Sequence, residues 1–211
     1  MNPYKLKHFF INKYLVDPIT KNKYYITYNY KYKTMWFQNY KVASRTIKKH
    51  FNKYTPNNKD IFSSGIDYIP AMCKDYFKFA FIREPSERFI SAWKDKVLQK
   101  NYFNFNVKER EKYQNLTDFI SWVEKQDIDR CDKHIRSQNS LIDLNEIDFL
   151  GRFENFNNDF CYLCETIGLP ISQPEKLNQS KKANINFTPS ELKRIKNIYS
   201  KDYRFFYPHL S

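Results

Sequence analysis

Short runs of apolar, largely aromatic residues along the chain predict buried β-strands. They occupy Thr34–Phe37 (TMWF), Phe77–Ile82 (FKFAFI) and residues 147–153 (IDFLGRF). Runs of this length, bounded by polar or turn-forming residues, are typical of strands inside a sheet. Residues 24–32 (YYITYNYKY) alternate roughly and predict a strand or hairpin arm at the sheet edge.

Apolar residues at helical spacing predict a helix after each of the three buried strands and two helices elsewhere. Their positions are 47, 50 and 51; 89, 92, 93 and 97; 116, 119, 120 and 123; 160, 163, 164 and 167; and 192, 195 and 199. Pro85 suits a first helical turn, and Thr188 with Glu191 predicts a capping box. Gly168 and Pro170 end the fourth of these helices.

Strands that alternate with helices predict an α/β fold, in which helices flank a central parallel sheet as a three-layer sandwich. The 211 residues fit a single domain over residues 1–211, with 1–33 as a basic, tyrosine-rich N-terminal arm. Residues 63–65 (Ser-Ser-Gly) predict a loop or turn, and residues 66–72 carry no predicted element.

The charge of the chain indicates an anionic partner, although a lysine-rich coding bias explains it equally well. Lys and Arg number 36 against 23 Asp and Glu, a formal net charge of +13. The basic residues are spread along the whole chain, so we expect no nucleic-acid-binding arm. No run approaches the roughly 20 apolar residues of a membrane helix, and the N-terminus lacks a signal-peptide core. We therefore expect a soluble, cytoplasmic protein.

The four cysteines do not form a disulfide framework in a chain of this length. Cys161 and Cys164 have the spacing of metal ligands, but they lie within a helical pattern and have no second Cys or His pair nearby. Packing in the core is the better interpretation, and we expect no metal site.

The segment between the first strand and its helix has the composition of an anion-binding loop. A strand, a short loop and a helix place backbone N–H groups at the helix N-terminus, where phosphate or sulfate binds. The Gly-Lys-Ser/Thr ending of the common nucleotide loop is absent, so this is not an ordinary ATP or GTP loop. The alternative is a basic surface turn that caps a helix. The residues are Lys41, Val42, Ala43, Ser44, Arg45 and Thr46.

A second strand–loop–helix unit places Arg83 at the end of a strand and Ser91 on the following helix. Ligands bind at the carboxyl edge of parallel strands, so both units can face one ligand. Arg forks onto phosphate oxygens, and a serine hydroxyl can complete the site. The alternative makes Arg83 a surface cap and Ser91 an ordinary helix serine.

Together these segments resemble the sulfotransferases that use 3′-phosphoadenosine-5′-phosphosulfate (PAPS), in particular the Golgi-type and bacterial carbohydrate sulfotransferases. Two further segments support the resemblance, Asp132-x-His134-x-x-x-Gln138 and Asn178-x-Ser180-Lys181. In four ordered segments it covers about residues 34–207. It implies a P-loop nucleotide-kinase-like sulfotransferase fold and sulfuryl transfer from PAPS to a hydroxyl of a carbohydrate or another acceptor, anionic glycans included. The product would be 3′-phosphoadenosine-5′-phosphate, with no metal and no nucleic acid involved.

The resemblance also implies residue roles. Lys41 would act on the leaving oxygen, with the rest of its loop to Thr46 around the 5′ end. Arg83 and Ser91 would hold the 3′-phosphate. His134 is the candidate base, because its ordinary pKa lies near neutrality; the alternatives are a surface loop histidine here and Asp67 as the base. Ser180 and Lys181 match the loop that covers the nucleotide in the family.

Three positions depart from the family pattern. Tyr40 stands where Pro usually precedes the lysine, Arg45 where a small or hydroxyl residue is usual, and Ile135 where Trp often follows the histidine. The alternatives are a P-loop-like kinase and a non-enzymatic polyanion- or nucleotide-binding protein. A kinase should have the Gly-Lys-Ser/Thr loop and an acidic strand end for Mg²⁺, and a binding protein gives no reason for the paired Lys41 and Arg83 loops.

Overall fold

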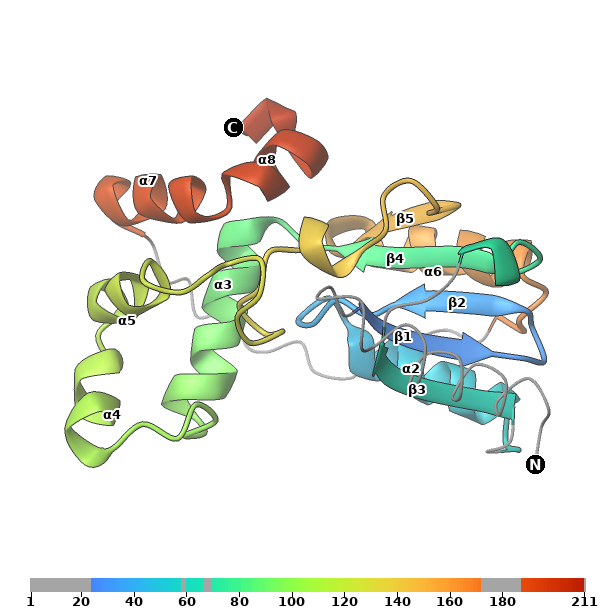
Figure 1. Cartoon of the computed structure of the whole chain (residues 1–211), viewed down its shortest axis with the longest axis horizontal. Helices are drawn as coiled ribbons and strands as arrows, with labels where there is room; N and C mark the ends of the chain where they lie inside the picture. Colours follow the sequence, from blue (N-terminus) through green and yellow to red (C-terminus); the bar gives the residue numbers. More distant parts are fainter. Residues whose placement is uncertain (1–23, 58–59, 67–69, 172–186, 211) are drawn as a thin grey trace. The chain divides into compact units, whose positions relative to one another are not determined.

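The computed structural model describes residues 24–57, 60–66, 70–171 and 187–210, which form two compact units (Figure 1). The sheet unit consists of the described residues of Met1–Ile82 and Ser140–Asn178. The helical unit consists of those of Arg83–Asn139 and Gln179–Ser211. The α/β class is confirmed, whereas a single domain over the whole chain stays a prediction.

The sheet unit contains a mixed sheet of five strands in the order β3-β1-β2-β4-β5. The strands are β1 (Tyr24–Asn29), β2 (Thr34–Phe37), β3 (Ile61–Ile66), β4 (Phe77–Ile82) and β5 (Phe149–Arg152). β2, β4 and β5 are parallel, but β1 is antiparallel to β2 and to β3. The prediction of a parallel sheet is therefore wrong for β1 and β3. The turn between β1 and β2 is too short for a crossover, so the two strands must form an antiparallel hairpin.

The edge of the sheet also differs from the prediction. β1 lies between β3 and β2, so the edge strand on this side is β3, which contains the Ser-Ser-Gly stretch that predicted a loop. The register of β3 against β1 runs from Ile61↔Asn29 to Ile66↔Tyr24. Because β3 needs only one partner strand, backbone pairing can define it without an apolar pattern.

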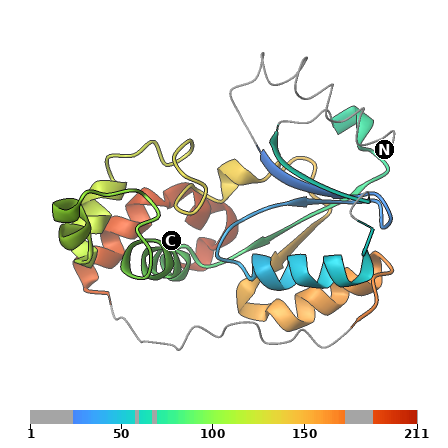
Figure 2. The same ribbon diagram turned by 90° about the horizontal axis from the view of Figure 1, so that it is seen from below.

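One face of the sheet is covered by α2 (Ser44–Tyr54) and α6 (Phe156–Thr166), which lie side by side in Figure 2. The predicted spacing of both helices is confirmed by their buried residues, and the third predicted layer stays a prediction. Gly151 is required in β5, since a Cβ there would lie 2.3 Å from Cε1 of Phe81. The core under these helices contains Trp36, Val42, Ile47, Phe51, Phe79, Phe81, Phe160, Leu163, Cys164 and Leu169.

The helical unit contains α3 (Pro85–Trp93), α4 (Val107–Tyr113), α5 (Leu116–Val123), α7 (Pro189–Ile198) and α8 (Ser200–Phe206). α3 continues into a π-helical turn, Lys94–Leu98. The predicted capping box of α7 is confirmed: Glu191 N donates to Thr188 Oγ1 at 3.2 Å, and Thr188 N donates to Glu191 Oε2 at 2.9 Å.

Single 3-10 turns occur in both units, at Pro70–Met72, Asn139–Leu141, Phe153–Asn155 and Pro208–Leu210.

None of the helices that the structure describes combines the length and the apolar character needed to cross a membrane. The four cysteines are free thiols. Cys164 packs in the core of the sheet unit as expected, whereas the expectation is wrong for Cys161, which is only half-buried.

Candidate active site

The loop between β2 and α2 is tied to the end of the neighbouring strand β4. Asn39 is fully buried, and its Nδ2 donates to the carbonyl oxygen of Phe81 at 2.9 Å. Ser44 Oγ donates to the carbonyl oxygen of Asn39 at 2.6 Å, which closes the loop on itself. Because β2 and β4 are parallel neighbours, both carboxyl ends lie at one sheet edge, as the sequence predicted.

Two residues of this loop have left-handed backbone conformations. Lys41 has φ 71°, and Ala43 has φ 60° and ψ 24°. Non-glycine residues pay a steric cost of about 1–2 kcal/mol there, so the surrounding contacts must hold the conformation. The Asn39 anchor supplies such a contact. Strained turns of this kind gather at ligand sites, which makes the loop a site candidate.

The first turn of α2 retains the electrostatic character that attracts an anion. Its N-cap residue Ala43 makes no side-chain cap, and the turn contains no acidic residue. The N–H groups of Thr46 and Ile47 donate to Ala43 O at 2.9 and 3.2 Å, which closes the turn. Such a helix start keeps a partial positive charge, and this fits a phosphate or a sulfate.

The side chains of the loop differ in what they can contribute to such a site. Val42 is fully buried in the sheet-unit core, so only its backbone can face a ligand. Thr46 is also buried, Lys41 and Ser44 are half-buried, and Arg45 is exposed. The loop therefore offers an amine, a guanidinium, hydroxyls and main-chain amides.

Arg83 is the first residue after β4 and begins the helical unit. Its Nη2 lies 3.2 Å from Glu87 Oε2; 14% of the Arg83 side chain is exposed against 64% of that of Glu87. Because the Glu87 carboxylate is exposed to water, this pair contributes little to stability. Ser91 lies half-buried two turns into α3.

The Glu84-Pro85 pair starts α3. The carboxylate of Glu84 caps the helix by accepting from Glu87 N at 2.8 Å, and it also accepts from Ser86 Oγ at 2.6 Å. The hydroxyl of Tyr203 in α8 hydrogen-bonds to the same carboxylate. The cap thus fixes the direction in which α3 leaves Arg83.

The backbone of Arg83 is held by Gln138. Arg83 N donates to Gln138 Oε1 at 3.0 Å, and Gln138 Nε2 donates to Arg83 O at 2.8 Å. Asp202 in turn accepts from the N–H groups of Gln138 and Asn139 at 2.8 and 2.9 Å. Burial raises the pKa of Asp202, while these N–H groups and the charge of Arg88 oppose the rise.

Arg88 connects α3 to the segment 130–137. Its guanidinium is buried and donates to the carbonyl oxygens of Arg136 at 2.8 Å and Lys133 at 3.2 Å. Tyr199 OH donates to Ile135 O at 2.7 Å. The sequence pattern did not predict these contacts of Arg88 and Tyr199. The available signal was a charged residue, Arg88, at an inward-facing position beside the apolar Phe89 and Ala92.

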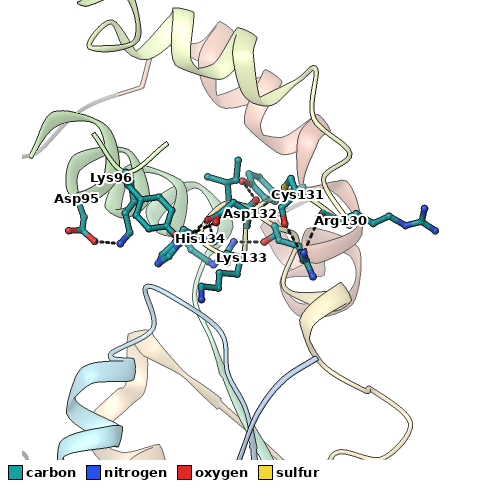
Figure 3. Close-up of polar contacts among 12 residues, drawn as sticks. Asp95, Lys96, Arg130, Cys131, Asp132, Lys133 and His134 are labelled. Carbon is teal, nitrogen blue, oxygen red and sulfur yellow. Dashed lines mark hydrogen bonds and ion pairs between the residues drawn. The ribbon is translucent and has the colours of Figure 1, made fainter. Parts of the chain in front are cut away.

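His134 forms a close pair with Asp132 (Figure 3). Its Nδ1 lies 2.8 Å from Asp132 Oδ1, and its backbone N–H donates to the same oxygen at 2.9 Å. Tyr102 OH donates to the other oxygen, Oδ2, at 3.2 Å. Burial raises the pKa of Asp132, but the hydrogen bonds from His134 and Tyr102 outweigh it and keep that pKa below its ordinary value.

The His134 ring is buried, and its pKa lies below the ordinary value. Burial is the main cause because it disfavours the charged ring; the cations of Lys96 and Lys133 act in the same direction, and Asp132 opposes them. Near neutral pH the ring is therefore uncharged and able to accept a proton, as a base requires.

The predicted site residues divide between the two units. Lys41 to Thr46 belong to the sheet unit, and Arg83, Ser91 and His134 belong to the helical unit. Ser180, Lys181 and Asp67 lie outside the described residues. In the part of the chain that the structure describes, no three His, Cys, Asp or Glu residues lie together as a metal site would need.

The chain belongs to the sulfotransferase family, whose model matches residues 10–208. Carbohydrate sulfotransferase 14 of Danio rerio is 27% identical over 123 residues, which cover 49% of this chain and 34% of that protein. The chain thus spans about a third of the length of this curated relative. No solved structure matches the chain. The family resemblance seen in the sequence is confirmed.

Proposed function

We propose that this protein transfers a sulfuryl group from PAPS to a hydroxyl, on a carbohydrate acceptor. The observation that carries the proposal is the β2–α2 loop, in which an anchored turn with left-handed Lys41 leads into a helix start without a side-chain cap or acidic residues. Family membership supports sulfuryl transfer, and the name of the zebrafish relative supports a carbohydrate acceptor.

The sheet topology is compatible with a P-loop nucleotide-kinase-like fold. β2 leads into α2 and β4 into α3, and these two strands are parallel neighbours. A nucleotide that carries phosphates at its 5′ and 3′ positions needs two anion sites. Each of the two strand–loop–helix units, which start at one sheet edge, would supply one of these anion sites.

The 5′ end of the donor would bind the loop from Lys41 to Thr46. The main-chain N–H groups at the start of α2 hold its phosphate, with the Ser44 and Thr46 hydroxyls and the exposed Arg45 beside them. Arg83 and Ser91 hold the 3′-phosphate, which distinguishes PAPS from ATP. Ser180 and Lys181, by their sequence match, would cover the nucleotide.

The donor supplies the sulfuryl group: the acceptor oxygen forms the new S–O bond while the bond from sulfur to the bridging phosphate oxygen breaks and leaves its electron pair there. Lys41 donates to this bridging oxygen and stabilises its growing charge. His134 takes the proton of the acceptor hydroxyl and becomes an imidazolium. Asp67 is the alternative base.

Ligand-induced stabilisation tests the donor site directly. We expect 3′-phosphoadenosine-5′-phosphate to raise the melting temperature, because it binds the native state, while ATP at the same concentration does not. Labelled PAPS, screened against glycans and small alcohols, then identifies the acceptor. Stabilisation by ATP alone would favour a kinase. Stabilisation by any polyanion, without transfer of label, would favour a binding protein.

A further inference from the structure

We propose that Asp132 is the positioning residue for His134: its carboxylate holds the proton on Nδ1 and so presents Nε2 to the acceptor hydroxyl. This inference rests on the proposed function, in which His134 is the base. It assigns a role to Asp132, which entered the sequence analysis only as part of the family pattern.

The contacts of Asp132 determine which ring nitrogen carries the proton. The low pKa of Asp132 leaves it ionised near neutrality, so its oxygens only accept hydrogen bonds. The Nδ1 of His134, 2.8 Å from Oδ1, must therefore be the donor. In this tautomer the lone pair that accepts a proton is on Nε2.

The carboxylate is itself held from two sides. The backbone N–H of His134 fixes Oδ1 at 2.9 Å, and Tyr102 OH fixes Oδ2 at 3.2 Å. The Tyr102 ring also packs edge-on against the imidazole, with centroids 4.7 Å apart. Two donors on different segments thus fix the carboxylate, and the ring contact restricts rotation of His134.

Charges from two segments face the imidazole. Asp132 and Lys133 lie on its own loop, and Lys96 lies on the π-helical turn after α3. Lys96 Nζ lies 4.3 Å from the Tyr102 ring centroid and 3.4 Å from Asp95 Oδ2, and its side chain is 10% exposed (Figure 3). Lys100 binds the other oxygen of Asp95 at 3.2 Å.

These charges have opposite effects on the base. Lys96 adds to the effect of burial, which keeps the resting ring neutral, whereas Asp132 stabilises the imidazolium that forms when the acceptor proton arrives. A carboxylate behind a histidine has this role in Ser-His-Asp triads, where it orients the ring and stabilises its charged form. The same geometry here serves attack on sulfur instead of carbon.

Nitrogen-15 NMR of the imidazoles tests the arrangement without any acceptor. His134→Gln assigns the His134 signals among the four histidines of the chain. In the wild type we expect a neutral ring protonated on Nδ1. Asp132→Asn keeps an amide oxygen for the Nδ1 proton but removes the charge, so the His134 pKa falls. Asp132→Ala removes both, and the ring shifts toward the Nε2-protonated tautomer.

Two further variants give matched comparisons. Lys96→Met removes a cation, so the His134 pKa should rise, opposite in sign to Asp132→Asn. Asp129→Asn alters a carboxylate of the same segment that instead binds Ser137 Oγ and Lys201 Nζ, both at 2.5 Å. It should leave both the tautomer and the His134 pKa unchanged. An equal effect of Asp129→Asn would reduce Asp132 to a structural loop residue.

Turnover gives the second readout. In Asp132→Asn the acidic limb of the plot of kcat against pH should move to lower pH. The plateau value of kcat should fall by at most the factor that a positioned base contributes, about 10²–10⁴. An unchanged tautomer and pKa in Asp132→Ala would overturn the positioning role while leaving the sulfotransferase proposal intact. Absence of PAPS turnover in the wild type would instead overturn the proposed function.

Discussion

The side-chain amide of Gln138 forms two hydrogen bonds with the backbone of Arg83, at 3.0 Å to its N–H and at 2.8 Å to its carbonyl oxygen. One residue of the Asp-x-His-x-x-x-Gln segment thereby fixes the main chain of the residue that we assign to the 3′-phosphate. Since Gln138 and His134 share this segment, the candidate base and the candidate phosphate ligand are held by one loop of the helical unit.

Gln138→Leu should destabilise the protein and weaken nucleotide binding. It leaves the N–H and C=O of Arg83 without their partner in a partly buried position, which costs about 1–3 kcal/mol for each group that finds no water. Urea unfolding measures the free energy of unfolding, and the shift in melting temperature with 3′-phosphoadenosine-5′-phosphate measures binding. Gln114→Leu, at an exposed position on the C-terminal side of α4, is the matched control and should change neither.

The strands and helices that the sequence predicts well are those with a local apolar pattern. β2 and β4 have the predicted bounds, because a run such as Phe77–Ile82 is buried on both faces. β3 was missed because its Ser-Ser-Gly stretch shows no such pattern; it pairs with β1 along the backbone and through a hydrogen bond between Thr27 Oγ1 and Ser63 Oγ at 2.8 Å. The antiparallel direction of β1 follows from the short turn between β1 and β2. The pattern of apolar residues contains no information on strand direction.

The residues of the candidate site divide in the same way, into those next to a local apolar pattern and those held by distant contacts. The positions of Lys41 and Arg83 in the loops after β2 and β4 could be predicted, because both strands are recognisable from their apolar runs. Gln138 could be noticed only as part of a family pattern and the role of Asp202 could not be predicted, since Gln138 binds a residue 55 positions away and Asp202 one 64 positions away. Contacts over such sequence distances leave no periodic signal. The role of Asp132 depended on an atomic distance, which no pattern of residue types reports.

Ala43→Val and Ala43→Gly should differ in their effect on stability. Ala43 has φ 60°, where a branched side chain is strained and glycine is not. We expect Ala43→Val to lower the free energy of unfolding by about 1–2 kcal/mol, and Ala43→Gly to leave it within about 1 kcal/mol of the wild type. Urea unfolding compares the two. Equal losses would mean that space around the side chain, and not the backbone conformation, limits this position.

Lys41→Ala should abolish turnover while nucleotide affinity stays within about tenfold, because the lysine acts mainly on charge that develops in the transition state. Single-turnover kinetics with labelled PAPS and equilibrium binding of 3′-phosphoadenosine-5′-phosphate separate the two effects. Lys48→Ala removes an exposed lysine from α2 and should be neutral. Near-normal turnover in Lys41→Ala would remove the lysine from the mechanism.

Arg83→Ala should weaken binding of 3′-phosphorylated nucleotides by about 2–5 kcal/mol, the loss expected for a bidentate charged contact in a largely closed site. Adenosine 5′-phosphosulfate lacks the 3′-phosphate and should bind wild type and variant equally. Isothermal titration of both nucleotides gives the comparison, with Arg110→Ala on the exposed surface of α4 as control. If Arg83→Ala still prefers the 3′-phosphorylated nucleotide, the 3′ site lies elsewhere.

His134→Gln should remove the acidic limb of the pH profile and lower kcat by about 10²–10⁴-fold, the range of a positioned base. In the wild type, log kcat plotted against pH should fall with unit slope below the His134 pKa, because the protonated ring cannot accept a proton. Burial lowers this pKa, so the limb lies below the ordinary value of about 6.5. Nucleotide binding should not change, since its proposed contacts are other residues. Asp67→Asn is the decisive companion variant: if it loses activity while His134→Gln retains it, the base is Asp67.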